Sequence, residues 1–317
     1  MEEIKINSSK STSAVSDNKN NSSKNFNNQK AFLEDKKVWK VLFKLCAPTI
    51  LMFLAISIYS ITDTIMATSL TTDYYSSGNT AISAMGYATT YLSILQGFSL
   101  LVNVGATIKY SMLISKNNHK EAEEFVGSAI SGTLIINVVV TSIGVGIAGP
   151  AIDLISGHNS TDALGNTTQA VSEAIRYVQI FGISVVFIAV YDIIVRFIRT
   201  DGSPNISGLI GVSGIPINIF FNWVFMGLCN MGIDGGAIAS VIGYSLTLII
   251  AVSYSLYLSK KSEHSIIFTS WKNLIPKWSF VGTALLFGLH ALTSNILMTV
   301  NTFSFIAFSN AITHPDF

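Results

Sequence analysis

A single carboxylate lies inside the first long apolar stretch of the chain. Asp63 stands between Ile61 and Ile65, and Lys44 is the only other charged residue from 41 to 68. Placing an unpaired carboxylate among apolar helices is costly, so such residues commonly carry a proton or bind a cation. The alternative is an aspartate that reaches the outer membrane surface and hydrogen-bonds to a loop. We favour the proton carrier or cation ligand.

Two asparagines form the second candidate set. Asn218 and Asn222 are four residues apart in an uncharged segment, so they share one face of a helix. Their amide oxygens could coordinate a small cation or hold a protonated carboxyl group. Equally, amide side chains join helices inside membranes by hydrogen bonding. Pro216, just before them, removes a backbone donor and favours a bend.

Three further polar features have simpler interpretations. Asp192 and Arg196 are four residues apart in the order that favours an ion pair on a helix, although a proton-relay role for Asp192 stays open. Ser240 alone is typical of helix packing. His290 could titrate near neutrality, but a single buried histidine is more often structural.

The elements that must position these residues are transmembrane helices. Half of the 317 residues are apolar and 12% are charged, about half the charged fraction of soluble domains. Charged residues are absent from Phe125 to Ile152, from Ser203 to Met231 and from Gly235 to Ser259. Each run is longer than the roughly 20 residues that cross a membrane. We therefore predict an all-α, multispan membrane protein.

The predicted fold is a polytopic bundle of about seven transmembrane helices. Glu121 and its acidic neighbours suit the start of the third helix, and residues 149–172 are polar enough for a loop. The last helix resembles the first, because Asn301-Thr302 aligns with Asp63-Thr64, as in transporters built from repeats. We expect helices over about 41–68, 80–115, 121–147, 173–199, 206–231, 235–257 and 279–308.

Four regions follow from this arrangement. Residues 1–37 are rich in Ser, Asn and Lys, which predicts a disordered cytoplasmic tail. Residues 38–258 form a six-helix N-terminal bundle. Residues 259–278 combine Trp, Ile and Lys, which predicts an amphipathic linker along the cytoplasmic interface. Residues 279–317 are the first helix of a second, incomplete bundle.

The basic residues predict the orientation in the membrane. Eighteen of the 19 lysines and arginines fall in or beside the tail and the links after the second, fourth and sixth helices, and only Arg176 breaks the pattern. The positive-inside rule therefore places the N-terminus in the cytoplasm and, with seven spans, the C-terminus outside. Cys46 and Cys229 then lie at opposite faces, so we expect free thiols that are buried among apolar residues.

The motifs of several other protein classes are missing from the sequence. It contains no Gly-rich phosphate loop ending in Lys-Ser or Lys-Thr, no His-Glu-x-x-His and no nucleophile elbow. We therefore expect no enzyme activity, no catalytic residue, no bound metal and no cofactor. The net charge of +1 gives no indication of nucleic-acid binding. The expected partners are the lipid bilayer and a small-molecule substrate.

Short groups of residues along the chain share their order with a known family. They are Asp63-Thr64; Gly97 and Gly105; Arg199, Gly202 and Pro204; Asn218-Ile219-Phe220-Phe221-Asn222; and Gly232 with the stretch from Gly235 to Ser240. In this order they resemble the signatures of the multidrug and toxic compound extrusion (MATE) family of secondary transporters, over about residues 38–317. The resemblance implies a V-shaped pair of six-helix bundles, in which a proton or sodium gradient drives the export of bulky, often cationic drugs.

The resemblance also implies a coupling site in the N-terminal bundle. Its residues would be Asp63, Tyr177, Asn218, Asn222 and Ser240, with Asp63 as the charge that binds and releases H⁺ or Na⁺. Asn222 stands where the family commonly has an aspartate, which leaves one carboxylate instead of two. We therefore expect weaker binding of a monovalent cation, or a single-proton mechanism.

Other interpretations stay open. Only one bundle and one further helix are present, so a cleft between two bundles would need missing sequence, a partner or a dimer. A lipid-linked saccharide flippase of the same superfamily would share the architecture. A non-transporting membrane scaffold, or the product of a decayed gene, is the third interpretation. We expect a bacterial cytoplasmic membrane as the location, and the excess of Lys over Arg indicates an AT-rich genome.

Overall fold

The computed structural model describes residues 38–69, 78–156, 169–261 and 274–313. The expected tail of residues 1–37 and most of the expected linker lie outside these ranges. By its internal contacts the chain divides into two units, Met1–Leu51 and Met52–Phe317. The described part of the first unit is helical. The second unit holds every residue of the candidate site.

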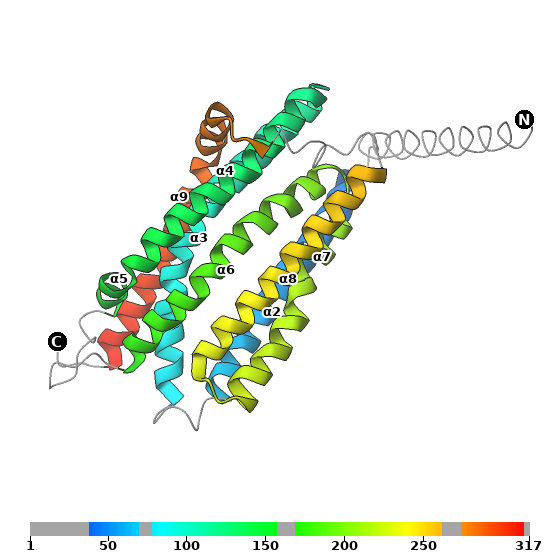
Figure 1. The fold of residues 1–317 in the computed structure, drawn as a ribbon. Coiled ribbons are helices and arrows are strands. Elements are labelled where there is room, and N and C mark those ends of the chain that lie inside the picture. The colour runs from blue at the N-terminus through cyan, green and yellow to red at the C-terminus, as the bar shows by residue number, and fades with distance from the viewer. Residues whose placement is uncertain (1–37, 70–77, 157–168, 262–273, 314–317) are drawn as a thin grey trace, which may run out of the picture. The chain divides into compact units, whose positions relative to one another are not determined.

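The described residues are almost all helical, which confirms the predicted all-α class. Seven of the helices are long and apolar enough to cross a membrane, as predicted. Figure 1 shows the elements in chain order. They are α2 (Val38–Ser69), α3 (Gly78–Ser115), α4 (His119–Gly146), α5 (Ala148–Ile155), α6 (Gln169–Thr200), α7 (Pro204–Asn222), the π-helix η1 (Trp223–Leu228), α8 (Gly232–Lys261) and α9 (Trp278–Thr313).

Helix α6 lies in the middle of the second unit. It packs against α3, α4 and α5 on one side and against α7 and α8 on the other, and Figure 1 shows it between these groups. Between Ile180 and Val190, Ser184 has the only polar side chain of this helix. A helix that is apolar on all sides suits the interior of a bundle. Two clusters of buried apolar residues accordingly form along it, one around Phe181 and one around Phe197.

The turns that join the helices have direct causes in the sequence. Asn118 caps α4, because its side chain accepts a hydrogen bond of 3.4 Å from the backbone N–H of Glu121 and donates one of 2.6 Å to the Glu121 carboxylate. Gly202 follows α6 with a φ of 90°, which L side chains rarely adopt. Pro204 then starts α7. Backbone geometry therefore requires the glycine of the Arg-x-x-Gly turn.

Two details differ from the expectations. The sequence predicts a loop over 149–172, but α5 occupies Ala148–Ile155. Of the remainder, Ser156 forms a turn, residues 157–168 lie outside the described ranges and residues 169–172 belong to α6. Ile152 of α5 is fully buried where α5 packs on α3 and α6. A short apolar helix therefore precedes the polar residues on which the prediction of a loop rests. Cys46 and Cys229 are free, as expected, but both are exposed, so the expected burial of the thiols is wrong.

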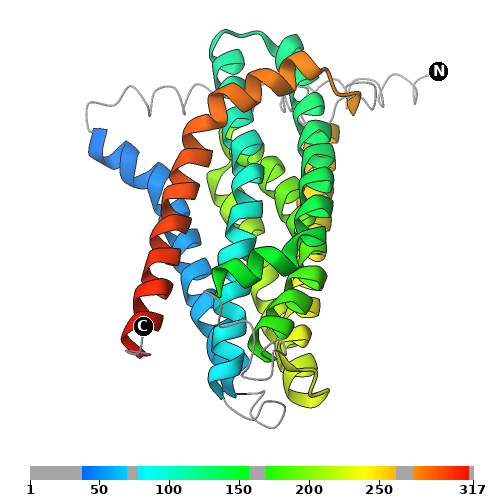
Figure 2. The same ribbon diagram turned by 90° about the vertical axis from the view of Figure 1, so that its left-hand side faces the viewer.

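Helices α3 and α9 cross at very close range. Gly105 lies against the backbone of Ala284, and Gly288 lies against the backbone of Leu101, so a side chain at either glycine would collide with the facing helix. Small residues at such contacts let two transmembrane helices approach closely. Figure 2 shows the two helices together near the start of α9 and apart toward its end.

Candidate functional site

Asp63 lies on the buried side of α2. It is 9% exposed, whereas its neighbours Ile61 and Ile65 are 62% and 59% exposed and face away from the bundle. Its carboxylate oxygen Oδ1 accepts a hydrogen bond of 2.5 Å from Asn222 Nδ2 on α7. The carboxylate of this apolar stretch is therefore turned toward the interior of the bundle.

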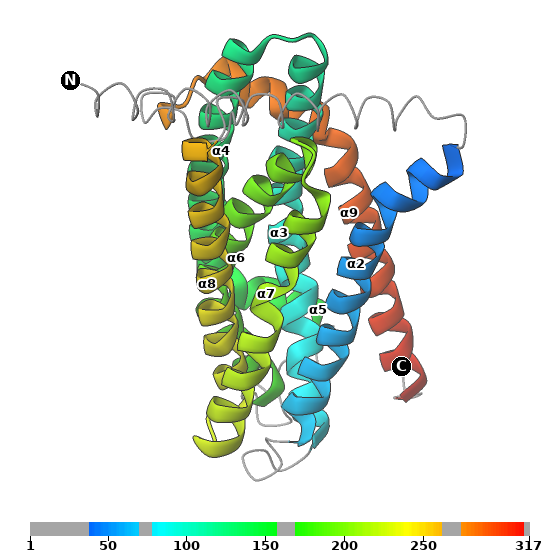
Figure 3. The same cartoon turned by 90° about the vertical axis from the view of Figure 1, so that its right-hand side faces the viewer.

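Hydrogen bonds continue from Asp63 across α7 to α8. Asn222 Nδ2 also donates to Asn218 Oδ1, at 2.9 Å, and Asn218 Nδ2 donates to Ser240 Oγ, at 3.0 Å. These three residues are at most 3% exposed. Figure 3 shows α7 between α8 and the later part of α2, which is the order that these bonds require. The two asparagines do join helices, and they do so beside the carboxylate.

Tyr177 reaches the same place from α6. It is buried, and its hydroxyl group interacts with Ser240. Its ring stacks on Phe181, with 5.6 Å between the ring centroids. The structure therefore brings together all five residues that the resemblance assigns to a coupling site, from four different helices.

The amide oxygen of Asn222 has no hydrogen-bond partner among the described residues. This oxygen, Oδ1, is buried and faces Gly236 at the start of α8, where an added Cβ atom would lie 3.7 Å away. Buried polar atoms are nearly always paired, so an unpaired one needs a partner such as water or an ion. Together with the Asp63 carboxylate it supplies hard oxygen ligands, which hard cations prefer.

The backbone around Asn222 is irregular. Pro216 lies inside α7 and has no N–H to donate, and the π-helix η1 begins directly after Asn222. Single π-turns within helices are frequent at functional sites. Gly235 of α8 lies against the backbone of Phe225 in η1, where an added Cβ atom would be 2.9 Å from the Phe225 carbonyl carbon. The glycines that open α8 therefore let η1 pack closely against it.

Two tyrosines at the site were not predicted from the sequence. Tyr59 and Tyr244 lie close enough to Asp63 to interact with its charge, and Tyr59 also interacts with Ser240. Helical spacing was the available signal, because Tyr59 is four residues before Asp63 and Tyr244 is four residues after Ser240. Tyr244 in turn stacks on Tyr191 of α6, with 6.1 Å between the ring centroids.

A second polar cluster, which is partly buried, joins α3, α4 and α6. Asn103 Nδ2 donates to Asp192 Oδ2, at 2.9 Å, and the Thr133 hydroxyl donates to Asn103 Oδ1, at 3.2 Å. Arg196 Nε lies 2.7 Å from Asp192 Oδ2, which confirms the predicted ion pair. These bonds tie three helices together, as polar side chains commonly do inside membrane bundles.

The candidate site has one negatively charged group, which would balance a single positive charge. It contains one carboxylate, two amides and hydroxyl groups. Within the described ranges, no three His, Cys, Asp or Glu side chains come together as they would around a metal ion. Divalent and transition metals usually take several carboxylates, thiolates or imidazoles. One carboxylate with neutral oxygens matches a proton or a monovalent cation.

Comparison with known proteins identifies the family. A family model described as MatE matches residues 48–224, which is more than half of the chain. The chain belongs to the MATE family. The multidrug export protein MepA of Staphylococcus aureus is 20% identical to this MATE chain over 217 residues, 68% of the chain and 45% of MepA. MepA of Staphylococcus saprophyticus is 22% identical over 220 residues, 69% of the chain and 46% of the relative. The chain thus spans about half the length of these relatives.

Solved structures share the fold of this MATE chain. A MOP superfamily transporter from Pyrococcus furiosus superposes with a TM-score of 0.70 at 18% identity, over 83% of this chain and 54% of that one. A multidrug resistance MATE family transporter in an outward-facing conformation superposes with a TM-score of 0.69 at 19% identity, with the same two coverages of 83% and 54%. At such identities the likeness concerns the fold alone.

Proposed function

We propose that this chain forms the cation-coupling half of a multidrug efflux transporter in the cytoplasmic membrane, with its N-terminus in the cytoplasm. It exchanges H⁺ or Na⁺ for bulky organic cations. Family membership supports drug efflux as the general activity. The candidate site supports two further parts of the proposal, namely that the coupling ion is H⁺ or Na⁺ and that Asp63 binds it.

The observation that carries the proposal is the unpaired oxygen of Asn222 beside the carboxylate of Asp63. A charged carboxylate inside a bundle is unfavourable, so a proton or a cation that binds there stabilises the site. A chain of hydrogen bonds runs from Asp63 through the two asparagines to Ser240, and it links α2, α7 and α8. Neutralising the charge therefore changes how strongly these helices are held together, and this difference allows an ion to favour one arrangement of the bundle over another.

Membrane vesicles that contain the protein and a cationic dye test this proposal. We expect a gradient of H⁺ or Na⁺ to drive the dye in the opposite direction. Asp63→Asn should reduce this transport by about tenfold or more, because a neutral amide neither takes up a proton nor balances a cation. Asp153→Asn, which removes a carboxylate of α5 outside the site, should retain it.

Two outcomes would contradict the proposal. Dye transport that is unchanged in Asp63→Asn would exclude Asp63 as the coupling residue. Translocation of a lipid-linked saccharide without dye transport would instead indicate a flippase.

The substrate cleft of the whole transporter requires a second bundle, because the chain spans about half the length of the curated relatives that it matches. We propose that either a C-terminal bundle or a second copy of the chain supplies it. Light scattering on the purified protein distinguishes these sources. Transport by a dimer of this chain supports the second copy, whereas transport that needs a longer polypeptide supports the first.

A further inference from the structure

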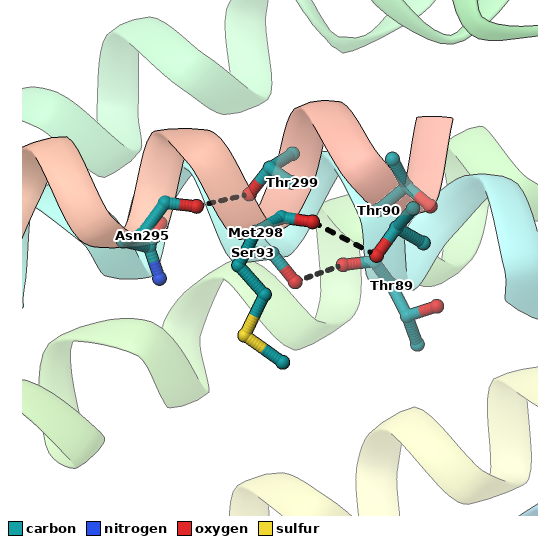
Figure 4. Close-up of a pocket in the computed structure, with 7 residues that line it drawn as sticks. Thr89, Thr90, Ser93, Asn295, Met298 and Thr299 are labelled. Atoms are coloured by element: carbon teal, nitrogen blue, oxygen red, sulfur yellow. Dashed lines mark hydrogen bonds between the residues drawn. The ribbon is translucent and has the colours of Figure 1, made fainter. Parts of the chain in front are cut away.

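A groove lined by hydroxyl groups lies between α3 and α9. It has a volume of about 120 Å³, which is room for several water molecules. Figure 4 shows side chains of the two helices on its walls. Its lining consists of Thr89, Thr90, Ser93, Asn295, Met298, Thr299 and Thr302. None of these belongs to the candidate coupling site, and all but Met298 are polar.

The groove exists because the two helices separate beyond their close crossing. The backbones touch at Gly105 and Gly288, and further along Gly97 faces Asn295. The helices run in opposite directions, so the residues before Gly97 on α3 face the residues after Asn295 on α9. Serine and threonine, rather than glycine, line the space between the helices there. The crossing at the glycines therefore sets the width of the groove.

The hydroxyl groups of the groove present lone pairs rather than hydrogens. Each donates its hydrogen to a carbonyl group one turn earlier in its own helix, as Thr90 does to Gly86 at 2.8 Å and Thr299 does to Asn295 at 3.0 Å. Thr89, Ser93 and Thr302 make the same bond. A hydroxyl oxygen has two lone pairs, so each oxygen remains able to accept a donor or a cation.

Asn295 adds an oxygen that lacks a partner. Its Oδ1 is buried, lies beside Gly97 of α3, and has no hydrogen-bond partner among the described residues. Leaving a buried acceptor unpaired is unfavourable, so a ligand that satisfies it is stabilised. The groove therefore offers five hydroxyl oxygens that are free to accept, and an unpaired amide oxygen lies beside it, buried against Gly97.

We propose that this groove binds a singly charged cation, either an alkali-metal ion or a primary ammonium group, at a site separate from Asp63. Neutral oxygens replace the hydration shell of monovalent ions in channel filters. A divalent ion would require carboxylates, and the lining has none. The neutral oxygens of the lining therefore favour a cation with a single positive charge, and they bind it weakly.

Equilibrium binding of radioactive Na⁺ to the purified chain tests the site. The Asp63→Asn variant removes the charge of the coupling site, so the saturable binding that remains reports on the groove. In this background, Thr90→Val and Thr299→Val should each weaken Na⁺ binding about fivefold, because each removes one accepting oxygen at nearly constant shape. Thr293→Val is the matched control, since its hydroxyl makes the same bond to Leu289 on the exposed side of α9.

A gain-of-binding variant and a competitor complete the experiment. Asn295→Asp places a charge at the unpaired oxygen and should strengthen Na⁺ binding about tenfold or more. Competition by methylammonium at lower concentrations than unlabelled Na⁺ would identify an ammonium group as the preferred ligand. The proposal is wrong if Asp63→Asn abolishes all saturable Na⁺ binding, or if neither Thr299→Val nor Asn295→Asp differs from Thr293→Val. None of these readouts depends on dye transport.

Discussion

Among single residues, the difference between an aspartate and an asparagine at position 222 decides the charge of the candidate site. Asn222 donates to both Asp63 and Asn218, which an aspartate could not do. It also leaves its own oxygen unpaired. An aspartate at this position would put two carboxylates within hydrogen-bonding distance, and such pairs retain a proton or a cation between them. The amide thus gives a site with one negative charge.

We expect Asn222→Asp to increase the affinity for Na⁺ by about tenfold or more, because the second charge strengthens the attraction for a cation in a poorly hydrated site. The measurement is Na⁺ binding, together with dye transport as a function of Na⁺ concentration. Asn117→Asp, which adds the same charge in the turn before α4, is the control. An unchanged dependence on Na⁺ in Asn222→Asp would show that the missing carboxylate does not limit ion binding.

Among the elements, the turn between α6 and α7 combines backbone geometry with a titratable group. Asp201 accepts a hydrogen bond from the hydroxyl group of Tyr110, a fully buried residue of α3. Asp201 is exposed on one side, yet desolvation of its carboxyl group by the surrounding protein raises its pKa from 3.8 to about 6. The bond from Tyr110 lowers the pKa and offsets this only in part.

This pKa predicts how stability depends on pH. Because the pKa of Asp201 is higher in the folded protein than in the unfolded chain, its contribution to stability is complete below about pH 4 and is lost as the pH rises through about 6. Asp201→Asn is neutral at every pH and still accepts from Tyr110. We therefore expect its melting temperature, relative to the unmodified protein, to increase from pH 4 to pH 7.

Thermal unfolding in detergent at several pH values measures this effect. Asp153→Asn, at the end of α5, controls for the loss of one carboxylate. A melting-temperature difference between Asp201→Asn and the unmodified protein that stays constant over this range would contradict the raised pKa of Asp201.

For the molecule as a whole, apolar length and charge determine how it is embedded. The seven long helices in the described part of the chain leave large apolar side chains exposed, such as Leu209 at 68% and Leu297 at 65%, which lipid surrounds without cost. Arg176, the basic residue that breaks the charge asymmetry, forms an ion pair with Asp234 and lies 3.6 Å from Glu173. Acidic neighbours therefore balance the charge of Arg176.

The predicted orientation has a direct test. Cys229 is exposed in the turn before α8, so in a Cys46→Ala variant a membrane-impermeant maleimide should label it in intact cells. In a variant without either native cysteine, Lys116→Cys in the exposed link between α3 and α4 should be labelled only after the membrane is opened. The reverse labelling pattern would place the N-terminus outside the cell.

Much of the architecture was predictable because it depends on local properties. Uncharged runs longer than a membrane is thick require transmembrane helices, and a spacing of four residues puts Asn218 and Asn222 on one helix face. The same spacing predicted the ion pair of Asp192 with Arg196. The short helix α5 was not predicted, because it spans only eight residues before a polar segment.

Contacts between residues far apart in the sequence could not be predicted, because they depend on how the helices pack. Asp63 and Asn222 are 159 residues apart, and no local pattern relates them. Without the order of motifs shared with the family, Ser240 was indistinguishable from any packing serine, and the groove between α3 and α9 gave no signal at all. Backbone hydrogen bonds within each helix determine its geometry, and this geometry determines the face on which each side chain lies. Which faces meet depends on close packing over the whole bundle, including the contact of Gly105 with the backbone of Ala284.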